Sequence, residues 1–307
     1  MPKMHISKSI VVNKPIGEVF SKLNDFNQWT AWSPWLIQDP KATVNVADDS
    51  KSYEWEGPRT GSGNMSIVNE VENKSLDMDL MFLKPWKSKA KVFFETEEVS
   101  EGTKVTWKMD SSLPFFMFWM KKQMVAFVGM DYERGLRLLK NYSEEGELQS
   151  KLEFKGNENL QETKFIGVKT QCTMDTMGKK MAEDMPKVGQ FVQEQGLEVS
   201  GAPFTQYHKW DVVNNNIEYT SGIPVKEAPE NLPAGFYVGS IPSTPVYTVE
   251  HKGPYQFLGN AWSSLYTMQR AKEISVNKKI DPFETYHNKP GEVEQTELIT
   301  QVHFPLS

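Results

Sequence analysis

Residues 203–208, PFTQYH, and residues 282–287, PFETYH, are two copies of one hexapeptide, and they decide how the second half of the chain folds. Each copy follows a strand and then a helical segment, and each is followed by a further strand that ends at a proline, Pro224 or Pro305. The strands and helices expected before the copies are 163–173, 177–195, 245–251 and 255–274. The repeating unit is therefore strand, helix, strand, strand. Two such units about a pseudo-twofold axis would leave a cleft between them.

The whole second half, residues 158–307, resembles the GyrI-like effector-binding family, the ligand-sensing half of multidrug-responsive transcription activators. The matching segments are Gly201-x-Pro203, Gly222-Ile223-Pro224-Val225, His251-x-Gly253-Pro254-Tyr255 with Ala261-Trp262, Glu284-x-Tyr286, and Glu297-Leu298-x-Thr300-x-Val302-x-Phe304-Pro305-Leu306. Those activators carry a helix-turn-helix on the same chain, and this sequence shows no basic recognition helix. We therefore expect ligand binding without direct control of transcription.

Strand alternation places Glu284 and Tyr286 on one face, with Phe283 and Thr285 on the other. The first copy has Thr205 in place of Glu284, so the fold itself does not require an acid there. A carboxylate in an aromatic cleft is costly to desolvate unless a cation or hydrogen bonds compensate. The family resemblance implies that Glu284 and Glu297 contact cationic aromatic ligands. A solvent-exposed acid on a strand is the alternative interpretation for both.

Aromatic side chains lie on or beside the elements that we expect to line this cleft. Together with Glu284 and Glu297 they are the candidate ligand-binding residues: Phe204, Tyr207, Tyr237, Tyr255, Trp262 and Tyr286. Trp262 and Tyr266 are four apart and share one helical face, where aromatic residues more often belong to the core. Glu284 and Tyr286 are also the only candidate catalytic pair, for general acid–base chemistry.

The first half predicts strands packed around one long helix. A strand at residues 9–12 and a helix opening at Pro15 come first. The remaining strands are expected at 41–47, 51–57, 63–71, 75–83, 88–98 and 102–110, with a final helix at 119–141. A single helix cannot bury its own apolar face, so it must lie across the sheet. We expect a cavity between the two.

This first half resembles the polyketide-cyclase/START-like (SRPBCC) superfamily. The residues that carry the resemblance are the spaced run from Pro15 through Trp29, Trp32 and Ser33-Pro34-Trp35, then Tyr53-x-Trp55-x-Gly57, Gly61-x-Gly63 and Gly129 to Lys140. The resemblance implies a helix-grip fold with a ligand cavity, and no particular reaction. The chain is thus expected to be α+β, with a helix-grip domain at 1–145, a polar linker at 143–157, and a duplicated β-α-β-β domain at 158–307.

Composition excludes several classes of function. The net charge of −6 and the pI near 5.6 give no broad basic surface for nucleic acid. Cys172 is the single cysteine, so no intrachain disulfide forms, and we expect a cytoplasmic protein. The five histidines show no metal-ligand spacing, and no phosphate-binding or nucleophile motif appears. We expect neither a metal nor a cofactor.

The most apolar stretch is residues 113–130, LPFFMFWMKKQMVAFVGM. Lys121 and Lys122 interrupt it, which argues against a membrane-spanning helix. For Phe115–Met120 we favour the rim of a cavity or an interface over a membrane surface.

Three functional hypotheses follow from the sequence. The favoured one is a binding protein that sequesters or senses small hydrophobic organic molecules, cations included. The second is an enzyme that hydrolyses reactive small molecules through the Glu284–Tyr286 pair. The third is a protein-interaction partner of a regulator.

Overall fold

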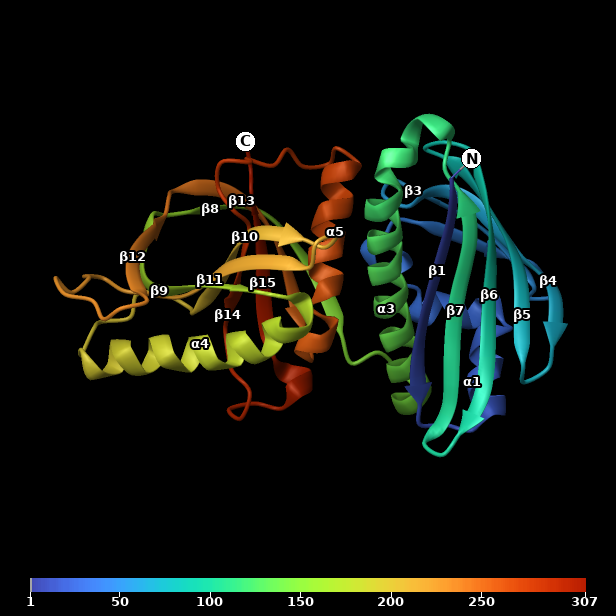
Figure 1. Cartoon of the computed structure of the whole chain (residues 1–307), viewed down its shortest axis with the longest axis horizontal. Helices are drawn as coiled ribbons and strands as arrows, with labels where there is room; N and C mark the ends of the chain where they lie inside the picture. Colours follow the sequence, from blue (N-terminus) through green and yellow to red (C-terminus); the bar gives the residue numbers. More distant parts are fainter. Residues whose placement is uncertain (1) are drawn as a thin grey trace. The chain divides into compact units, whose positions relative to one another are not determined.

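The computed structural model describes residues 2–307, and the chain divides after Gln149 into two compact units. Each unit contains one antiparallel sheet with helices packed on it, so the protein is α+β as expected. Figure 1 shows the two sheets, in blue to green for the first unit and in green to red for the second. No helix in the described part of the chain combines the length and apolar character that crossing a bilayer requires.

The first unit is a seven-stranded sheet with the order β1-β7-β6-β5-β4-β3-β2. Its strands are β1 (Lys3–Val12), β2 (Thr43–Val46), β3 (Ser52–Gly57), β4 (Gly61–Val71), β5 (Ser75–Lys84), β6 (Ser88–Val99) and β7 (Gly102–Ser112). Its helices are α1 (Ile16–Leu23), α2 (Phe26–Trp32), α3 (Lys121–Glu145) and the short 3-10 segments η1 (Leu36–Gln38) and η2 (Phe115–Met120). The predicted strands and the long helix are confirmed, and α3 packs on the sheet along β1 (Figure 1).

Aromatic side chains fill the middle of the space between this sheet and α3. Trp107 of β7 stacks between Phe94, at 4.8 Å between ring centroids, and Tyr132 of α3, at 4.1 Å. Trp29 and Trp32 of α2 close the cluster edge-on, and all five rings are at most 3% exposed. The expected cavity is therefore a packed core at this level, because the tryptophans that could have walled it contact one another instead.

An open hollow of about 1010 Å³ remains at the end of the unit where α3 begins. Met81, Ala90 and Val125 contribute apolar surface to its lining, and Lys121 and Lys122 contribute charge. The first unit thus has an accessible depression at one end and a packed aromatic core at its centre.

The second unit is an eight-stranded sheet with the order β12-β9-β11-β10-β14-β15-β13-β8. Its strands are β8 (Lys151–Leu160), β9 (Thr163–Cys172), β10 (Phe204–Asp211), β11 (Asn216–Pro224), β12 (Phe236–Ile241), β13 (Thr244–Lys252), β14 (Phe283–Tyr286) and β15 (Ile299–Pro305). Its helices are α4 (Met174–Glu194), α5 (Gly259–Arg270) and the 3-10 segments η3 (Tyr255–Phe257) and η4 (Gln295–Glu297).

Each repeat contains one strand more than the sequence predicts, and the two repeats exchange it. β8 precedes the first repeat but pairs with β13 of the second, whereas β12 precedes the second repeat but pairs with β9 of the first. The segment 143–157, expected as a polar linker, therefore contains the end of α3 and most of β8. Leu152 and Phe154 alternate along β8 and pack against the core beneath α5, which explains why this polar segment is ordered in the sheet.

The two hexapeptides meet at the centre of this sheet. β10 and β14 are antiparallel neighbours, and Thr205 lies directly opposite Glu284, its counterpart in the other copy. The backbone hydrogen bonds on either side also match, since Tyr207 N donates to Pro282 O at 3.0 Å and Tyr286 N donates to Pro203 O at 2.9 Å. The pseudo-twofold axis predicted by the repeat therefore passes between Thr205 and Glu284.

Both long helices of the second unit lie on one face of its sheet. Val188, Phe191 and Val192 of α4 pack on β9 and β11, and Leu265 and Met268 of α5 pack on β13 and β15. Four residues lie directly opposite one another in successive strands, so their side chains point to this same face of the sheet: Ser221, Thr205, Glu284 and Val302. Glu284 is thus on the helix-covered face, near the axis that relates the α4 half to the α5 half.

Candidate functional site

Glu284 is a buried carboxylate, 2% exposed, that accepts three hydrogen bonds from aromatic side chains. The hydroxyls of Tyr207 and Tyr286 donate to Oε1 at 3.0 and 2.6 Å, and Trp262 Nε1 donates to Oε2 at 2.6 Å. Among residues 2–307, no ion pair of the structure involves Glu284. Aromatic donors therefore solvate this carboxylate, while its negative charge has no basic side chain beside it.

The two tyrosines are counterparts in the repeat, and they reach Glu284 from opposite sides of the axis. The Tyr286 hydroxyl is 2.6 Å from Glu284 and 2.9 Å from Thr205 Oγ1. Because a phenol has one proton, Tyr286 donates it to the carboxylate and Thr205 donates to the phenol oxygen. Tyr207 and Tyr286 are thus related by the pseudo-twofold axis. The two residues nearest the axis, Thr205 and Glu284, differ in chemistry.

Burial shifts the pKa values of this cluster upwards. Desolvation raises the pKa of Glu284, although the hydrogen bonds from Tyr286, Trp262 and Tyr207 act in the opposite direction. The pKa values of Tyr207 and Tyr286 also lie well above the usual phenol value, because both hydroxyls are buried beside Glu284. The tyrosines therefore stay protonated as donors, and the carboxyl group is the member of the cluster that changes charge.

Further aromatic rings surround the carboxylate. Tyr207 and Trp262 pack edge to face at 4.9 Å between ring centroids, and Tyr255 packs edge to face on Tyr286 at 5.9 Å. Tyr255 is 38% exposed, so this side of the cluster lies next to solvent. A negative charge bordered by electron-rich rings is the environment in which an organic cation is attracted by both.

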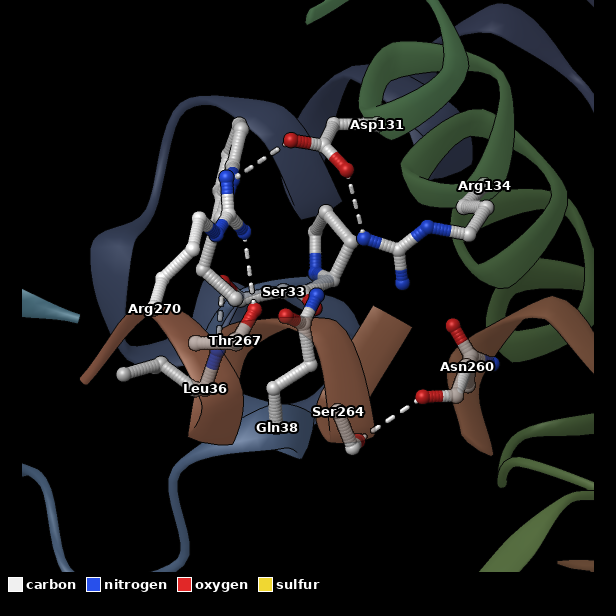
Figure 2. A network of polar contacts seen from close by, with 11 residues as sticks. Ser33, Leu36, Gln38, Asp131, Arg134, Asn260, Ser264, Thr267 and Arg270 are labelled. Atoms are coloured by element: carbon white, nitrogen blue, oxygen red, sulfur yellow. Dashed lines mark hydrogen bonds and ion pairs between the residues drawn. The ribbon is translucent and has the colours of Figure 1, made fainter. Parts of the chain in front are cut away.

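Trp262 is held in place by α5, whose other contacts stiffen the helix. Ser264 Oγ donates to the Asn260 carbonyl at 2.8 Å, and Arg270 Nη2 donates to Thr267 Oγ1 at 2.9 Å (Figure 2). Leu265 and Met268 anchor the same helix in the core. Trp262 is half-buried, which agrees with a side chain that both covers the site and lies near its edge.

The structure brings together five of the eight candidate residues, namely Glu284, Tyr207, Tyr286, Trp262 and Tyr255. Phe204 and Tyr237 pack with Phe165 and Phe283 on the opposite face of the sheet. The Glu297 carboxylate pairs with Lys252 at 2.6 Å, and its side chain is 56% exposed. Phe204 and Tyr237 thus belong to a second core, and Glu297 to a surface ion pair.

A second buried acid, Asp184 of α4, was missed by the sequence reasoning. It is 9% exposed and accepts from the Tyr219 hydroxyl at 2.8 Å and from Thr170 Oγ1 at 2.7 Å. Tyr219 pairs directly with Tyr207, so this group adjoins the Glu284 cluster on the first-repeat side. The signal was present as a lone acid on the apolar face of the helix at 177–195.

The second repeat has a different pair beside Tyr286. Thr300 is the strand neighbour of Tyr286, His251 is the neighbour of Thr300, and both are 0% exposed. His251 Nε2 is 3.0 Å from Ser150 Oγ, and burial lowers the pKa of His251 to about 4. His251 is therefore neutral near pH 7, and the cluster receives no positive charge from it.

The first unit has a buried carboxylate of a different kind, Asp39, which is 2% exposed. It accepts hydrogen bonds from Arg59 N at 2.8 Å, Thr60 N at 2.9 Å and Thr60 Oγ1 at 3.1 Å, and none of these three donors is an aromatic side chain. Asp131 of α3 accepts from Arg134 Nη2 at 2.8 Å, shown in Figure 2, and Glu133 pairs with Lys8. No group of three or more potential metal ligands occurs in residues 2–307. Burial raises the pKa of Cys172 and so disfavours its thiolate.

Residues 158–307 match the family model described as a GyrI-like small molecule binding domain. The second unit is therefore a GyrI-like domain, as its motifs indicated. Comparison with curated protein sequences gives no match.

Three solved structures show weaker likenesses. The C-terminal domain of EcmrR is 22% identical, the alignment covers 52% of this chain and 99% of that one, and the TM-score is 0.43. SAV2435 bound to tetraphenylphosphonium is 13% identical, with 50% and 94% covered and a TM-score of 0.39. The Aha1 dimer from Colwellia psychrerythraea is 16% identical, with 47% and 98% covered and a TM-score of 0.36.

Proposed function

We propose that the second unit binds lipophilic organic cations, and that the Glu284 carboxylate is the group that selects for positive charge. The observation that supports this most is a fully buried acid with three aromatic donors and no basic partner among the described residues. Such an arrangement satisfies the hydrogen bonds of the carboxylate and leaves its charge uncompensated. A cation stacked among the rings would supply that compensation.

The repeat explains why the acid is at this position. Thr205 keeps the backbone pairing across the axis, so the fold does not depend on a carboxylate at residue 284. A group that the fold does not need, and that is costly to bury, is best explained by what it binds. Tyr207 and Tyr286 then hold the carboxylate in one orientation.

Calorimetric titration of wild type and Glu284→Gln with two ligands tests the proposal. Tetraphenylphosphonium, the molecule in the SAV2435 structure, serves as the cation, and triphenylphosphine oxide serves as a neutral molecule of similar chemistry. Loss of the charge should weaken binding of the cation by about tenfold or more and leave binding of the neutral molecule nearly unchanged. Equal losses for both ligands would mean that Glu284 only shapes the site.

Glu297→Gln is the matched control, because it removes the same charge from an exposed ion pair with Lys252. It should bind both ligands as wild type does. If Glu297→Gln weakens binding of the cation as much as Glu284→Gln does, the effect comes from the net charge of the protein, and the assignment of Glu284 is wrong. Recovery of the ligand unchanged after titration separates binding from the hydrolase hypothesis.

We also propose that the first unit, residues 1–145, is an SRPBCC-like domain. Support comes from the curved antiparallel sheet with the long helix α3 packed on it, and from the hollow at the end where α3 begins. The packed aromatic core restricts any ligand of this unit to that hollow. Ligand-induced stabilisation that is lost when Ala90 is enlarged to Phe would support the hollow as a site.

A further inference from the structure

The first unit exposes its most apolar segment. η2 carries Phe115, Phe116, Phe118 and Trp119, which are 77%, 75%, 59% and 68% exposed, and no residue of η2 is buried. The segment is therefore not buried within this chain and does not line the hollow, so of the two favoured expectations, the rim of a cavity and an interface, only the interface stays open. An apolar patch of this kind on a protein surface marks a site of interaction.

A second exposed apolar segment lies at the same end of the sheet. Leu83, near the end of β5, is 39% exposed, and Trp86, in the turn between β5 and β6, is 58% exposed. β6 begins at Ser88, and Ala90 near its start pairs with Ser111 near the end of β7. Since η2 follows β7 in the chain, η2 and the turn before β6 lie at the same end of the sheet. We call residues 83–89 and 115–122 together the aromatic–lysine end.

Within these two stretches of sequence, lysines accompany the aromatic residues and acids do not, although Glu56 and Asp79 of neighbouring strands pair with Lys84 and Lys91. The segment 80–94 contains four lysines and no Asp or Glu, and residues 111–130 contain Lys121 and Lys122 and no acid. Lys87, Lys89, Lys121 and Lys122 are all exposed. On a chain whose net charge is −6, this end is therefore a local concentration of positive charge around exposed rings.

The hollow of the first unit borders on both segments. Its lining includes Lys89 from the start of β6, and Lys121 and Lys122 from the start of α3. Two acids, Asp79 and Asp110, also line it, together with Lys3 and Lys91, so lysines outnumber acids in the lining. Apolar side chains, among them Met81 and Val125, also contribute to the lining. Three lysines of the aromatic–lysine end thus line an accessible depression, and its aromatic residues lie outside that lining.

We propose that the aromatic–lysine end docks the protein on the surface of an anionic lipid membrane. Phenylalanine and tryptophan rings partition into the region between headgroups and acyl chains, while lysines lie among anionic headgroups. Each lysine near such a surface adds to the attraction, and long lysine side chains reach the headgroups as the rings insert. A protein partner would match the rings as well, but the four exposed lysines beside them favour an extended anionic surface. This proposal is independent of Glu284.

The test is co-sedimentation of the full chain with vesicles of phosphatidylcholine alone and with vesicles that also contain phosphatidylglycerol. We expect binding to the anionic vesicles, weaker binding to neutral ones, and a shift of tryptophan emission to shorter wavelength on binding. F116S/W119S removes two exposed rings, and K121E/K122E reverses two charges. Each double variant should weaken binding to anionic vesicles by about tenfold or more.

K278E/K279E is the control, because it reverses an exposed adjacent lysine pair in the second unit. It should bind the anionic vesicles as wild type does. Failure of wild type to sediment with them would overturn the proposal, as would equal weakening by both lysine pairs. A wild-type dimer that F116S/W119S converts to a monomer, without vesicle binding, would show instead that a second copy covers this surface.

Discussion

The two units treat the space between sheet and helix in opposite ways. In the first, Phe94, Trp107 and Tyr132 stack into a core against α3. In the second, the corresponding space holds a carboxylate, Glu284, with Tyr207, Tyr286 and Trp262 donating to it. Aromatic residues are abundant in both, so composition alone does not distinguish the two spaces. Rings contact one another in both units, and the difference is that the rings of the second also donate hydrogen bonds to a buried carboxylate.

We expect the largest effect from the exchanged strand β8. Most of β8 lies before residue 158, where the match to the family model begins, yet β8 pairs with β13 inside the second unit. A fragment of residues 150–307 should show one cooperative thermal transition. A fragment of residues 158–307 lacks most of β8, which exposes the edge of β13 and removes Leu152 and Phe154 from the core. We expect it to aggregate or to melt without cooperativity. Equal transitions for the two fragments would show that β8 is dispensable.

The packed core of the first unit predicts a large effect from a single residue. Trp107→Ala should lower the free energy of unfolding of that unit by about 3–5 kcal/mol, because Trp107 is 1% exposed and stacks on two rings. Trp86→Ala, at a tryptophan 58% exposed, should change it by no more than about 0.5 kcal/mol. Denaturant unfolding measures both. A small loss for Trp107→Ala would mean that the space can collapse, contrary to a tight core.

Acid should destabilise the second unit more than the first. Burial lowers the pKa of His251 to about 4 and that of His303 to about 3, whereas an unfolded histidine titrates near 6.5. The unfolded chain therefore binds protons first as the pH falls, and stability is lost by about 1.4 kcal/mol per pH unit for each histidine, from about pH 6.5 down to the folded pKa. The raised pKa of Glu284 acts in the opposite direction, because its folded form takes up a proton at higher pH.

Calorimetric unfolding of the 150–307 fragment between neutral and acidic pH measures this slope. His251→Gln should reduce it by about half. A slope that stays the same in His251→Gln would show that the buried histidines do not govern acid stability.

Much of this arrangement was accessible from the sequence. The hexapeptide repeat predicted the pseudo-twofold axis, and strand alternation placed Glu284 and Tyr286 together. Alternation also implies that Phe204 faces away from Thr205 and Tyr207, so its position in the opposite core follows from the same rule. The positions of the strands and of the long helix of the first unit were likewise predicted from turn residues and apolar periodicity.

Long-range pairing was not accessible in the same way. The exchange of β8 and β12 depends on which strands meet across the repeats, and nothing local to residues 151–160 specifies the partner. Asp184 joins Tyr219 and Thr170 from a different element, so its burial is a tertiary effect. Tryptophans in the first unit could equally line a cavity or fill it, because that choice depends on their contacts with Phe94 and Tyr132.

The affinity of the second unit for tetraphenylphosphonium as a function of pH tests the central claim most directly. Because burial raises the pKa of Glu284, lowering the pH protonates the carboxyl group and removes the charge that the cation needs. Wild type should bind more tightly as the pH rises, by up to about tenfold per pH unit below the pKa of Glu284, and then level off. Glu284→Gln should show weak binding that does not change with pH. The same pH dependence in both proteins, or none in either, would contradict the assignment of Glu284 as the group that recognises positive charge.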